Sequence, residues 1–267
     1  MSEARDETPG PATFKLATWN IHYGIGSDRR FDIARIVQVL GEIDADIVGL
    51  QEVGWHRRTH HRIDHFAYLR EHTDYTVVAG LVRDPLRSHF GNALLTRFPV
   101  TATRWIDLKI RGHVPRAAVL AEIETPAGPL RVAALHLGLA TWERERQAKR
   151  LVAALKEEEQ KSAEQKAEEE TESTRPTALL PTALLPTVLL GDFNMLRARS
   201  LAGDILAARF PFCVRLPSYP ARRPRLSLDR IYLSAEWEIL NAGVVDQGLA
   251  LQASDHLPLV AEARLKP

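Results

Sequence analysis

Short runs of apolar or alternating residues recur along the chain, and they have the length typical of β-strands. The runs that predict strands are Phe14 to Trp19, Asp46 to Leu50, Tyr75 to Ala79, Ala93 to Leu95, Ala117 to Ile123, Leu130 to Leu135, Thr187 to Leu190, Ile231 to Leu233 and Leu257 to Ala263. Two other stretches, 33–40 and 148–155, carry apolar residues on one helical face. The segment Glu124-Thr-Pro-Ala-Gly-Pro129 is typical of a hairpin turn, so we expect partly antiparallel sheets. The pattern predicts a mixed α and β fold.

The stretch from Lys156 to Arg175 interrupts this pattern, because Glu, Lys, Gln and Ala dominate it and leave no apolar face to bury. We interpret it as an inserted, mobile excursion, which could prolong the preceding helix into solvent. A direct repeat follows, with two copies of Pro-Thr-Ala-Leu-Leu from Pro176 and Pro181, and Pro-Thr-Val-Leu-Leu from Pro186. Only the last copy leads directly into Gly191, so it is the predicted strand. The earlier copies are interpreted as a spacer, since proline removes donors that a central strand needs; a partner-docking segment is the less favoured alternative.

Composition bounds the domain organisation and the location. The sequence predicts a flexible N-terminus over 1–12 and a single domain over 13–267 that carries the charged insertion and repeat at about 156–186. The 35 basic and 34 acidic residues almost cancel, which excludes the global positive field of a nucleic-acid coat protein. A lone cysteine, Cys213, excludes an intramolecular disulfide framework. With no signal-like N-terminus and no apolar run long enough for a membrane span, we expect a cytoplasmic protein, with peripheral membrane contact left open.

Polar side chains stand where the predicted buried strands end. The residues at these positions are Asn20, Glu52, His136, Asp192, Asn194, Asp229, Asp255 and His256. Taken alone, each of them is more typical of a solvated loop or an ordinary turn. Together they predict a cluster of carboxylates, amides and imidazoles at one rim of a sheet. Such a cluster suits metal-dependent hydrolysis of phosphate esters, because hard cations prefer oxygen ligands and phosphoryl transfer needs positioning and charge neutralisation.

The same residues lie in a series of motifs with a known counterpart. In order these are Thr18-Trp-Asn-Ile-His, Leu50-Gln-Glu-Val, Gly91-Asn-Ala-Leu-Leu-Thr, Leu135-His-Leu-Gly-Leu, Gly191-Asp-Phe-Asn, Leu228-Asp-Arg-Ile-Tyr and Ser254-Asp-His. Through them nearly the whole chain resembles the endonuclease/exonuclease/phosphatase superfamily, which includes exonuclease III, deoxyribonuclease I, neutral sphingomyelinases and inositol-polyphosphate 5-phosphatases. The resemblance implies a four-layer α/β/β/α sandwich, in which two packed mixed β-sheets are flanked by helices, and a Mg²⁺ or Mn²⁺ cofactor.

The resemblance also implies a role for each motif residue. Glu52 would be the main metal ligand with Asn20 nearby, and Asp255 would complete the metal site or its surroundings. Asp192 would position or deprotonate the attacking water, and Asn194 would hold the phosphate. The remaining roles fall to His256, which would contact the phosphoryl group, and Asp229, which would orient that histidine.

Other positions bear on the substrate. His136 is followed by Leu-Gly-Leu, whereas abasic-site nucleases place a tyrosine there, so the sequence argues against an abasic-site repair enzyme. A protonated His136 would stabilise phosphoryl charge. Arg116 matches a family arginine near the site, and Asn92 is a second, weaker substrate-binding candidate. Arg223, with its neighbouring arginines, either faces the substrate phosphate or forms a solvated rim.

A histidine-rich stretch follows Glu52, from His56 through His60 and His61 to His65. Pairs of histidines four residues apart suggest zinc. However, no cysteine and no catalytic glutamate accompany them, so a structural zinc site is disfavoured. The preferred interpretations are a cationic wall of the substrate pocket or a stretch that is simply exposed.

Three functions remain in play at this point. The first is a phosphodiesterase or phosphatase acting on a small or phospholipid-derived phosphoester, as the opening and the 216–232 stretch resemble bacterial members of unsettled substrate, some encoded beside cardiolipin-synthase-like enzymes. The second is a nuclease that cuts DNA or RNA. The third is a catalytically inactive scaffold. No obligate protein partner is evident from the sequence.

Overall fold

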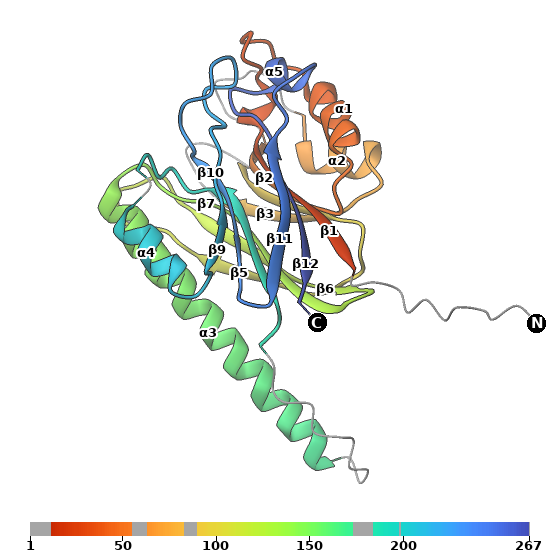
Figure 1. The fold of residues 1–267 in the computed structure, drawn as a ribbon, viewed down its shortest axis with the longest axis vertical. Helices are drawn as coiled ribbons and strands as arrows, with labels where there is room; N and C mark the ends of the chain where they lie inside the picture. The colour runs from red at the N-terminus through yellow and green to blue at the C-terminus, as the bar shows by residue number, and fades with distance from the viewer. Residues whose placement is uncertain (1–11, 55–62, 83–89, 173–183, 198, 267) are drawn as a thin grey trace, which may run out of the picture.

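Two six-stranded β-sheets pack face to face, and helices cover the outer face of each (Figure 1). The fold comes from a computed structural model that describes residues 12–54, 63–82, 90–172, 184–197 and 199–266. The helices over the first sheet are α1 (Ile33–Ile43), α2 (His65–His72) and α5 (Ala250–Ala253), and those over the second are α3 (Thr141–Glu172) and α4 (Leu201–Ala207). The predicted four-layer sandwich is confirmed.

The strand order places the parallel pairs in the middle of the sheets. The first sheet runs β11 (Trp237–Val244), β12 (Leu259–Leu265), β1 (Thr13–Asn20), β2 (Ile47–Gly54), β4 (Phe90–Thr96), β3 (Thr76–Val82). The second runs β5 (Val100–Asp107), β6 (Ala117–Thr125), β7 (Gly128–His136), β8 (Thr187–Asp192), β10 (Asp229–Leu233), β9 (Phe212–Val214). Only β1 with β2 and β7 with β8 pair in parallel, and the other neighbours are antiparallel. The β6–β7 hairpin confirms the predicted turn.

Alternation along the central strands builds three apolar layers. In β8, Val188 and Leu190 pack into the core between the sheets, while Leu189 faces the helices on the outside. In β1, Leu16 points between the sheets and Trp19 points toward α1. Because successive side chains alternate between the two faces of a strand, a strand with both faces covered needs an unbroken apolar run. That need explains the runs in the sequence.

The two sheets pack closely near Gly49 of β2. A Cβ atom at this position would lie 2.5 Å from the Cβ of Leu190 in the opposite sheet. No van der Waals contact is that short, so only glycine fits there without moving a strand. The close approach holds the ends of β1 and β2 against the end of β8.

Helix α1 shows how local sequence sets the outer layer. Its buried residues Ile33, Ile36, Leu40 and Ile43 follow a three-and-four spacing along one face. Asp32 precedes the helix and accepts a hydrogen bond from the backbone N–H of Ala34 at 3.1 Å, which caps the N-terminus.

The strands that the sequence analysis did not predict lie at the edges of the sheets. They are β5, β9 and β11, each with only one neighbouring strand. In β5 most side chains are exposed or partly exposed, so no apolar run marks it. The short α2, α4 and α5 were missed as well, because helices of eight residues or fewer leave little periodicity to detect.

The charged segment after residue 156 continues α3 as far as Glu172, and this end of the helix projects away from the sheets (Figure 1). The first Pro-Thr-Ala-Leu-Leu copy and most of the second, as well as His56, His60 and His61, lie outside the described residues. Among the described helices, none is long and apolar enough to cross a membrane.

His65 is the one histidine of that stretch whose position is described, and it is fully buried. Its Nδ1 accepts a hydrogen bond from the backbone N–H of Gly54 at 3.1 Å, and its ring stacks on Phe31. Burial lowers the pKa of His65 from 6.5 to about 4. The neutral ring therefore ties α2 to the end of β2.

We predict that His65 makes the protein sensitive to acid. Because its pKa is lower in the folded state, the unfolded chain binds more protons between pH 6.5 and about 4, and stability falls as the pH falls through this window. Between pH 7 and pH 4.5 the expected loss is about 2 kcal/mol of unfolding free energy. Urea unfolding at pH 7 and pH 4.5 measures it. His65→Asn keeps a hydrogen-bond acceptor but does not titrate, so its unfolding free energy should depend less on pH than that of the wild type. The exposed His72→Asn should keep the pH dependence of the wild type. The same pH dependence of the unfolding free energy in all three proteins would contradict the prediction.

Candidate active site

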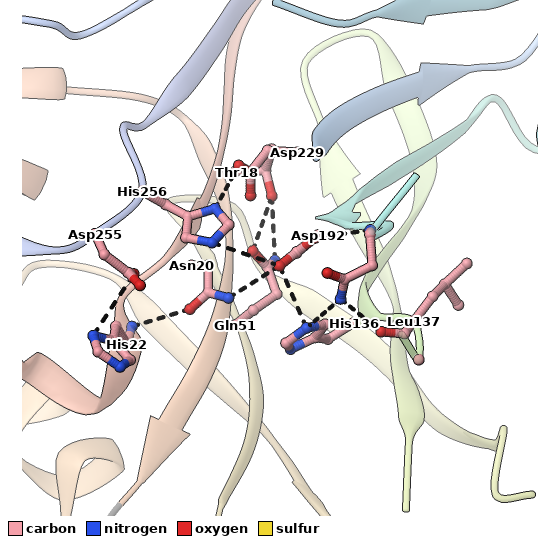
Figure 2. Close-up of polar contacts among 12 residues, drawn as sticks. Thr18, Asn20, His22, Gln51, His136, Leu137, Asp192, Asp229, Asp255 and His256 are labelled. Atoms are coloured by element: carbon pink, nitrogen blue, oxygen red, sulfur yellow. Dashed lines mark hydrogen bonds and ion pairs between the residues drawn. The ribbon is translucent and has the colours of Figure 1, made fainter. Parts of the chain in front are cut away.

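Polar contacts of both sheets converge on the buried carboxylate of Asp192, the last residue of β8 (Figure 2). Its Oδ2 accepts a hydrogen bond from Asn20 Nδ2 at 3.1 Å and lies 3.4 Å from His136 Nε2. His256 Nε2 approaches the same oxygen to 3.9 Å. The residues that end β1, β7 and β8 thus meet at one point, as the sequence predicted.

Asn194 closes the turn that follows β8. Its backbone N–H donates to Asp192 Oδ1 at 2.9 Å, and its φ of 52° is a left-handed conformation that asparagine tolerates. The Nδ2 amide donates to the carbonyl of Leu137 at 3.0 Å and lies 3.0 Å from His136 Nε2. In this structure the Asn194 amide therefore orients His136.

Asp229 and His256 form a buried pair on the other side of Asp192. His256 Nδ1 lies 2.8 Å from Asp229 Oδ2, which also accepts a hydrogen bond from the Ser218 hydroxyl. The Trp19 indole N–H donates to the His256 carbonyl at 2.9 Å, which fixes the backbone. The His256 ring and the Asp229 carboxylate thus lie in direct contact, an arrangement that would let Asp229 orient His256.

The two histidines beside Asp192 carry different charges. Burial alone opposes protonation of His256, but Asp229 first, and then Asp192 and Asp255, outweigh it and raise the pKa of His256 to about 10. Burial, helped by the positive charge of Arg116, lowers the pKa of His136 to about 3. These neighbours favour the neutral form of His136, whose Nε2 can then accept the Asn194 amide proton.

Glu52 sits on an irregular part of β2. The pairing with β4 shifts register between Leu50 and Val53, and Glu52 has a φ of 55°, a strained value for this residue type. Burial raises the pKa of Glu52, with His22 and Arg116 opposing the shift and Asp255 and Asp192 adding to it. The bulge turns the carboxylate toward the other acids of the site, at an energetic cost that a bound cation would offset.

A small pocket joins Glu52 to the substrate-binding candidates. Its lining includes Glu52, Asn92, Arg116 and His136. The Nε of Arg116 is buried without a hydrogen-bond partner among the described residues, so this guanidinium has unused donor capacity. Asn92 instead donates its amide to the carbonyl of Ala117 at 2.8 Å, a contact between the two sheets.

Arg223 lies apart from these groups, on the exposed loop between β9 and β10. Its backbone N–H donates to the carbonyl of Pro220 at 2.9 Å. The same loop contributes Tyr219, whose ring centroid lies 4.7 Å from that of His256. Of the two sequence interpretations, the structure gives Arg223 the position of a rim residue.

His22 is a site residue that the sequence analysis did not single out. Its Nδ1 lies 3.7 Å from Asp255 Oδ1, and its backbone N–H donates to Asn20 Oδ1 at 3.0 Å. Its place two positions after Asn20 was the available signal. Ser218, in contrast, carries no signal, since its contact with Asp229 depends on the path of a loop.

The donor chemistry of the site fits a hard divalent cation. Asp192, Asp229 and His256 have ligand atoms within 4.8 Å of one another, but the paired and protonated His256 has no lone pair to give. Glu52 and Asp255, together with Asp192, are oxygen donors whose charges repel each other. Oxygen-rich, negatively charged surroundings are what Mg²⁺ and Mn²⁺ prefer.

The model of the endonuclease/exonuclease/phosphatase family matches residues 17–256, which include every candidate site residue. The chain belongs to this family. Its members are metal-dependent phosphoesterases or nucleases. Among curated proteins, the uncharacterized protein YbhP of Escherichia coli K12 is 28% identical over 274 residues, covering 95% of this chain and 97% of YbhP.

Solved structures share the fold at lower sequence identity. A family member from Beutenbergia cavernae has a TM-score of 0.69 at 20% identity and covers 95% of this chain and 72% of its own. The catalytic domain of human Nocturnin, solved with a bound sulfate anion, has a TM-score of 0.70 at 20% identity, with 96% of this chain and 94% of its own covered. These similarities establish the fold and leave the substrate open.

We predict that the charge of His256 depends on Asp229. In metal-free protein, the His256 imidazole should stay protonated at neutral pH and titrate near pH 10, and Asp229→Asn should bring its pKa down toward the ordinary value of about 6.5. NMR of histidine-labelled protein measures the titration, and the signal missing in His256→Asn assigns it. Asp246→Asn, at an exposed position, is the control and should leave the pKa of His256 unchanged. A wild-type titration near pH 6.5 would exclude the buried ion pair.

Proposed function

We propose that the protein is a metal-dependent phosphodiesterase or phosphatase that hydrolyses a phosphate ester by attack of water. The observation that carries the proposal is the placement of Asp192 between a neutral and a protonated histidine. A carboxylate held in this way suits a group that aims or deprotonates water, while a neighbouring cation suits the charge of a phosphoryl group. These features also weigh against an inactive scaffold.

Each side chain then has a proposed task. Asp192, oriented by Asn20 and the backbone of Asn194, positions the water and accepts its proton. His256, kept protonated by Asp229, donates to a phosphoryl oxygen. Neutral His136 keeps its hydrogen-bonded place beside Asp192 and orients the substrate, with Asn194 as its brace.

The metal site of the proposal is made of Glu52 and Asp255, with Asn20 at its edge. A bound Mg²⁺ or Mn²⁺ would neutralise phosphoryl charge and lower the pKa of a bound water molecule. Arg116 faces the same pocket and is proposed to bind a phosphate oxygen, with Asn92 shaping the wall. Arg223 keeps its place as a proposed contact at the rim.

The proposed substrate is a small or phospholipid-derived phosphoester. The single-domain organisation over 13–267 and a cytoplasmic location with peripheral membrane contact complete the proposal. Nuclease activity is the alternative within the same chemistry, and one structure with a similar fold is that of D. rerio TDP2 complexed with a single-strand DNA product. The first experiment below distinguishes the two.

We predict metal-dependent hydrolysis that depends on the carboxylate–histidine cluster. An activated phosphodiester, an activated phosphomonoester and plasmid DNA are incubated with the protein in Mg²⁺, Mn²⁺ or EDTA. Asp192→Asn and His256→Asn should each lower turnover by about 10² to 10⁴-fold, because proton transfer and charge stabilisation are lost. The exposed Asp204→Asn and His72→Asn serve as matched controls. Preferred cleavage of plasmid DNA would favour the nuclease, and no turnover of any ester would count against the proposal.

We further predict that Glu52 dominates metal affinity. Calorimetric titration of metal-free protein with Mn²⁺ should give a dissociation constant at least tenfold weaker for Glu52→Gln, since a hard cation loses its charged oxygen ligand. Glu262→Gln, an exposed substitution on β12, should bind as the wild type does. Unchanged affinity in Glu52→Gln would move the metal elsewhere, for instance to the group of Asp192 and Asp229.

A further inference from the structure

Large apolar side chains are exposed on the loops that leave the candidate site and on the first turns of the helices that follow these loops. Leu139 is 75% exposed, Leu196 65%, Leu201 53% and Trp142 45%. They account for four of the eight large apolar side chains that are exposed among the described residues, and they include the two most exposed. Large apolar side chains that are exposed close to a functional site often serve contact with a partner or a membrane.

These residues follow the catalytic strands directly. Leu139 comes three positions after His136, and Leu196 four positions after Asp192. The two loops lie side by side, because β7 and β8 pair in parallel with His136 opposite Asp192 and the Asn194 amide bonds to the Leu137 carbonyl. Leu201 begins α4, which lies against α3, and Trp142 stands in the first turn of α3 (Figure 1).

Buried arginines hold both loops in place from beneath. Arg144 donates to the carbonyls of Gly138 and Leu139, and Arg230 donates to those of Met195 and Arg197 at 3.1 and 3.2 Å. Both guanidinium groups belong to buried residues. Leu139 and Leu196 are therefore exposed on backbone that is fixed by charge-assisted hydrogen bonds, and not on segments without contacts.

The surroundings of the four apolar residues are positively charged. Arg146, Arg197 and Arg199 are exposed, and among the described residues no ion pair is seen for them. Arg146 stacks over the ring of Trp142, with 5.1 Å from its Cζ to the ring centroid. Asp204 on α4 is the nearby exposed acid. Exposed apolar side chains with arginines between them match an anionic lipid surface, which offers hydrocarbon below a layer of negative headgroups.

We propose that Leu139, Trp142, Leu196 and Leu201, the apolar rim, dock the protein on an anionic lipid bilayer beside the active site. Three of the four are leucines, which insert into hydrocarbon but do not stack on bases, so nucleic acid is the less suitable occupant. Trp142, which stacks with Arg146, suits the headgroup layer of a bilayer, because its ring is apolar but carries a polar N–H. The inference rests on the proposed function, because docking here would present a lipid phosphoester to Asp192.

Sedimentation with vesicles tests the apolar rim. Wild-type protein, Leu139→Ser/Leu196→Ser and the control Leu240→Ser are mixed with phosphatidylcholine vesicles with and without phosphatidylglycerol. Leu240 is exposed on β11. We expect the wild type and this control to bind vesicles that contain phosphatidylglycerol more tightly than vesicles of phosphatidylcholine alone. The double variant should bind at least tenfold more weakly. Arg197→Ala/Arg199→Ala should weaken binding as well and remove most of its dependence on salt.

Turnover of the soluble activated ester in the same preparations separates this inference from the proposed function. Equal turnover in the wild type and the double variant, with binding lost only in the latter, supports the apolar rim. Vesicle binding that is absent in the wild type, or unchanged in the double variant, overturns it. If the double variant instead loses affinity for single-stranded DNA, the rim is a nucleic-acid surface and the lipid assignment is wrong. If the protein binds vesicles as expected but hydrolyses no ester, the proposed enzymatic function is rejected and the proposed docking of the apolar rim on a bilayer stands.

Discussion

The hydrogen bond between Asn20 and Asp192 is the contact on which the rest of the candidate site depends, because it joins the two sheets at the strand ends that carry this site. Asn20 ends β1 and Asp192 ends β8, so their distance is set by how closely the sheets pack. That packing is tight near Gly49, where no larger side chain fits. A shift of one sheet against the other would separate Asp192 from its donor, and placement errors of about 1 Å are enough to lower catalytic rates severely.

Around this contact the chain keeps two histidines in opposite states. Desolvation acts on both, but His256 faces the Asp229 carboxylate at 2.8 Å, whereas His136 faces the positive charge of Arg116 and an amide donor. In a region of low dielectric such differences in neighbours outweigh the intrinsic pKa. The chemistry that the motifs imply is thus encoded less in the histidines themselves than in the partners that the fold gives them.

Much of this arrangement was predictable from the sequence, and the exceptions have physical causes. Strands with both faces covered need unbroken apolar runs, so the central strands and the polar residues at their ends could be located. Edge strands such as β5 need no such run and were missed. The neutral state of His136 depends on contacts made by residues distant in sequence, and so does the link between Ser218 and Asp229. Leu139 and Leu196 illustrate a third limit, since an apolar residue beside a buried strand resembles core until its exposure is known.

The loops that carry the proposed chemistry and the loops that carry the apolar rim are the same, and this shared use constrains both. The Leu137 carbonyl fixes Asn194, and the same backbone continues to Leu139 under the hold of Arg144. Arg230 follows Asp229 directly in β10, yet its side chain extends to the opposite side and supports the carbonyl of Met195, the residue next to Asn194. Rigid backbone costs conformational entropy and limits adaptation to different substrates. The proposed bilayer contact needs such rigidity, because the exposed leucines must then keep a fixed height above the candidate site.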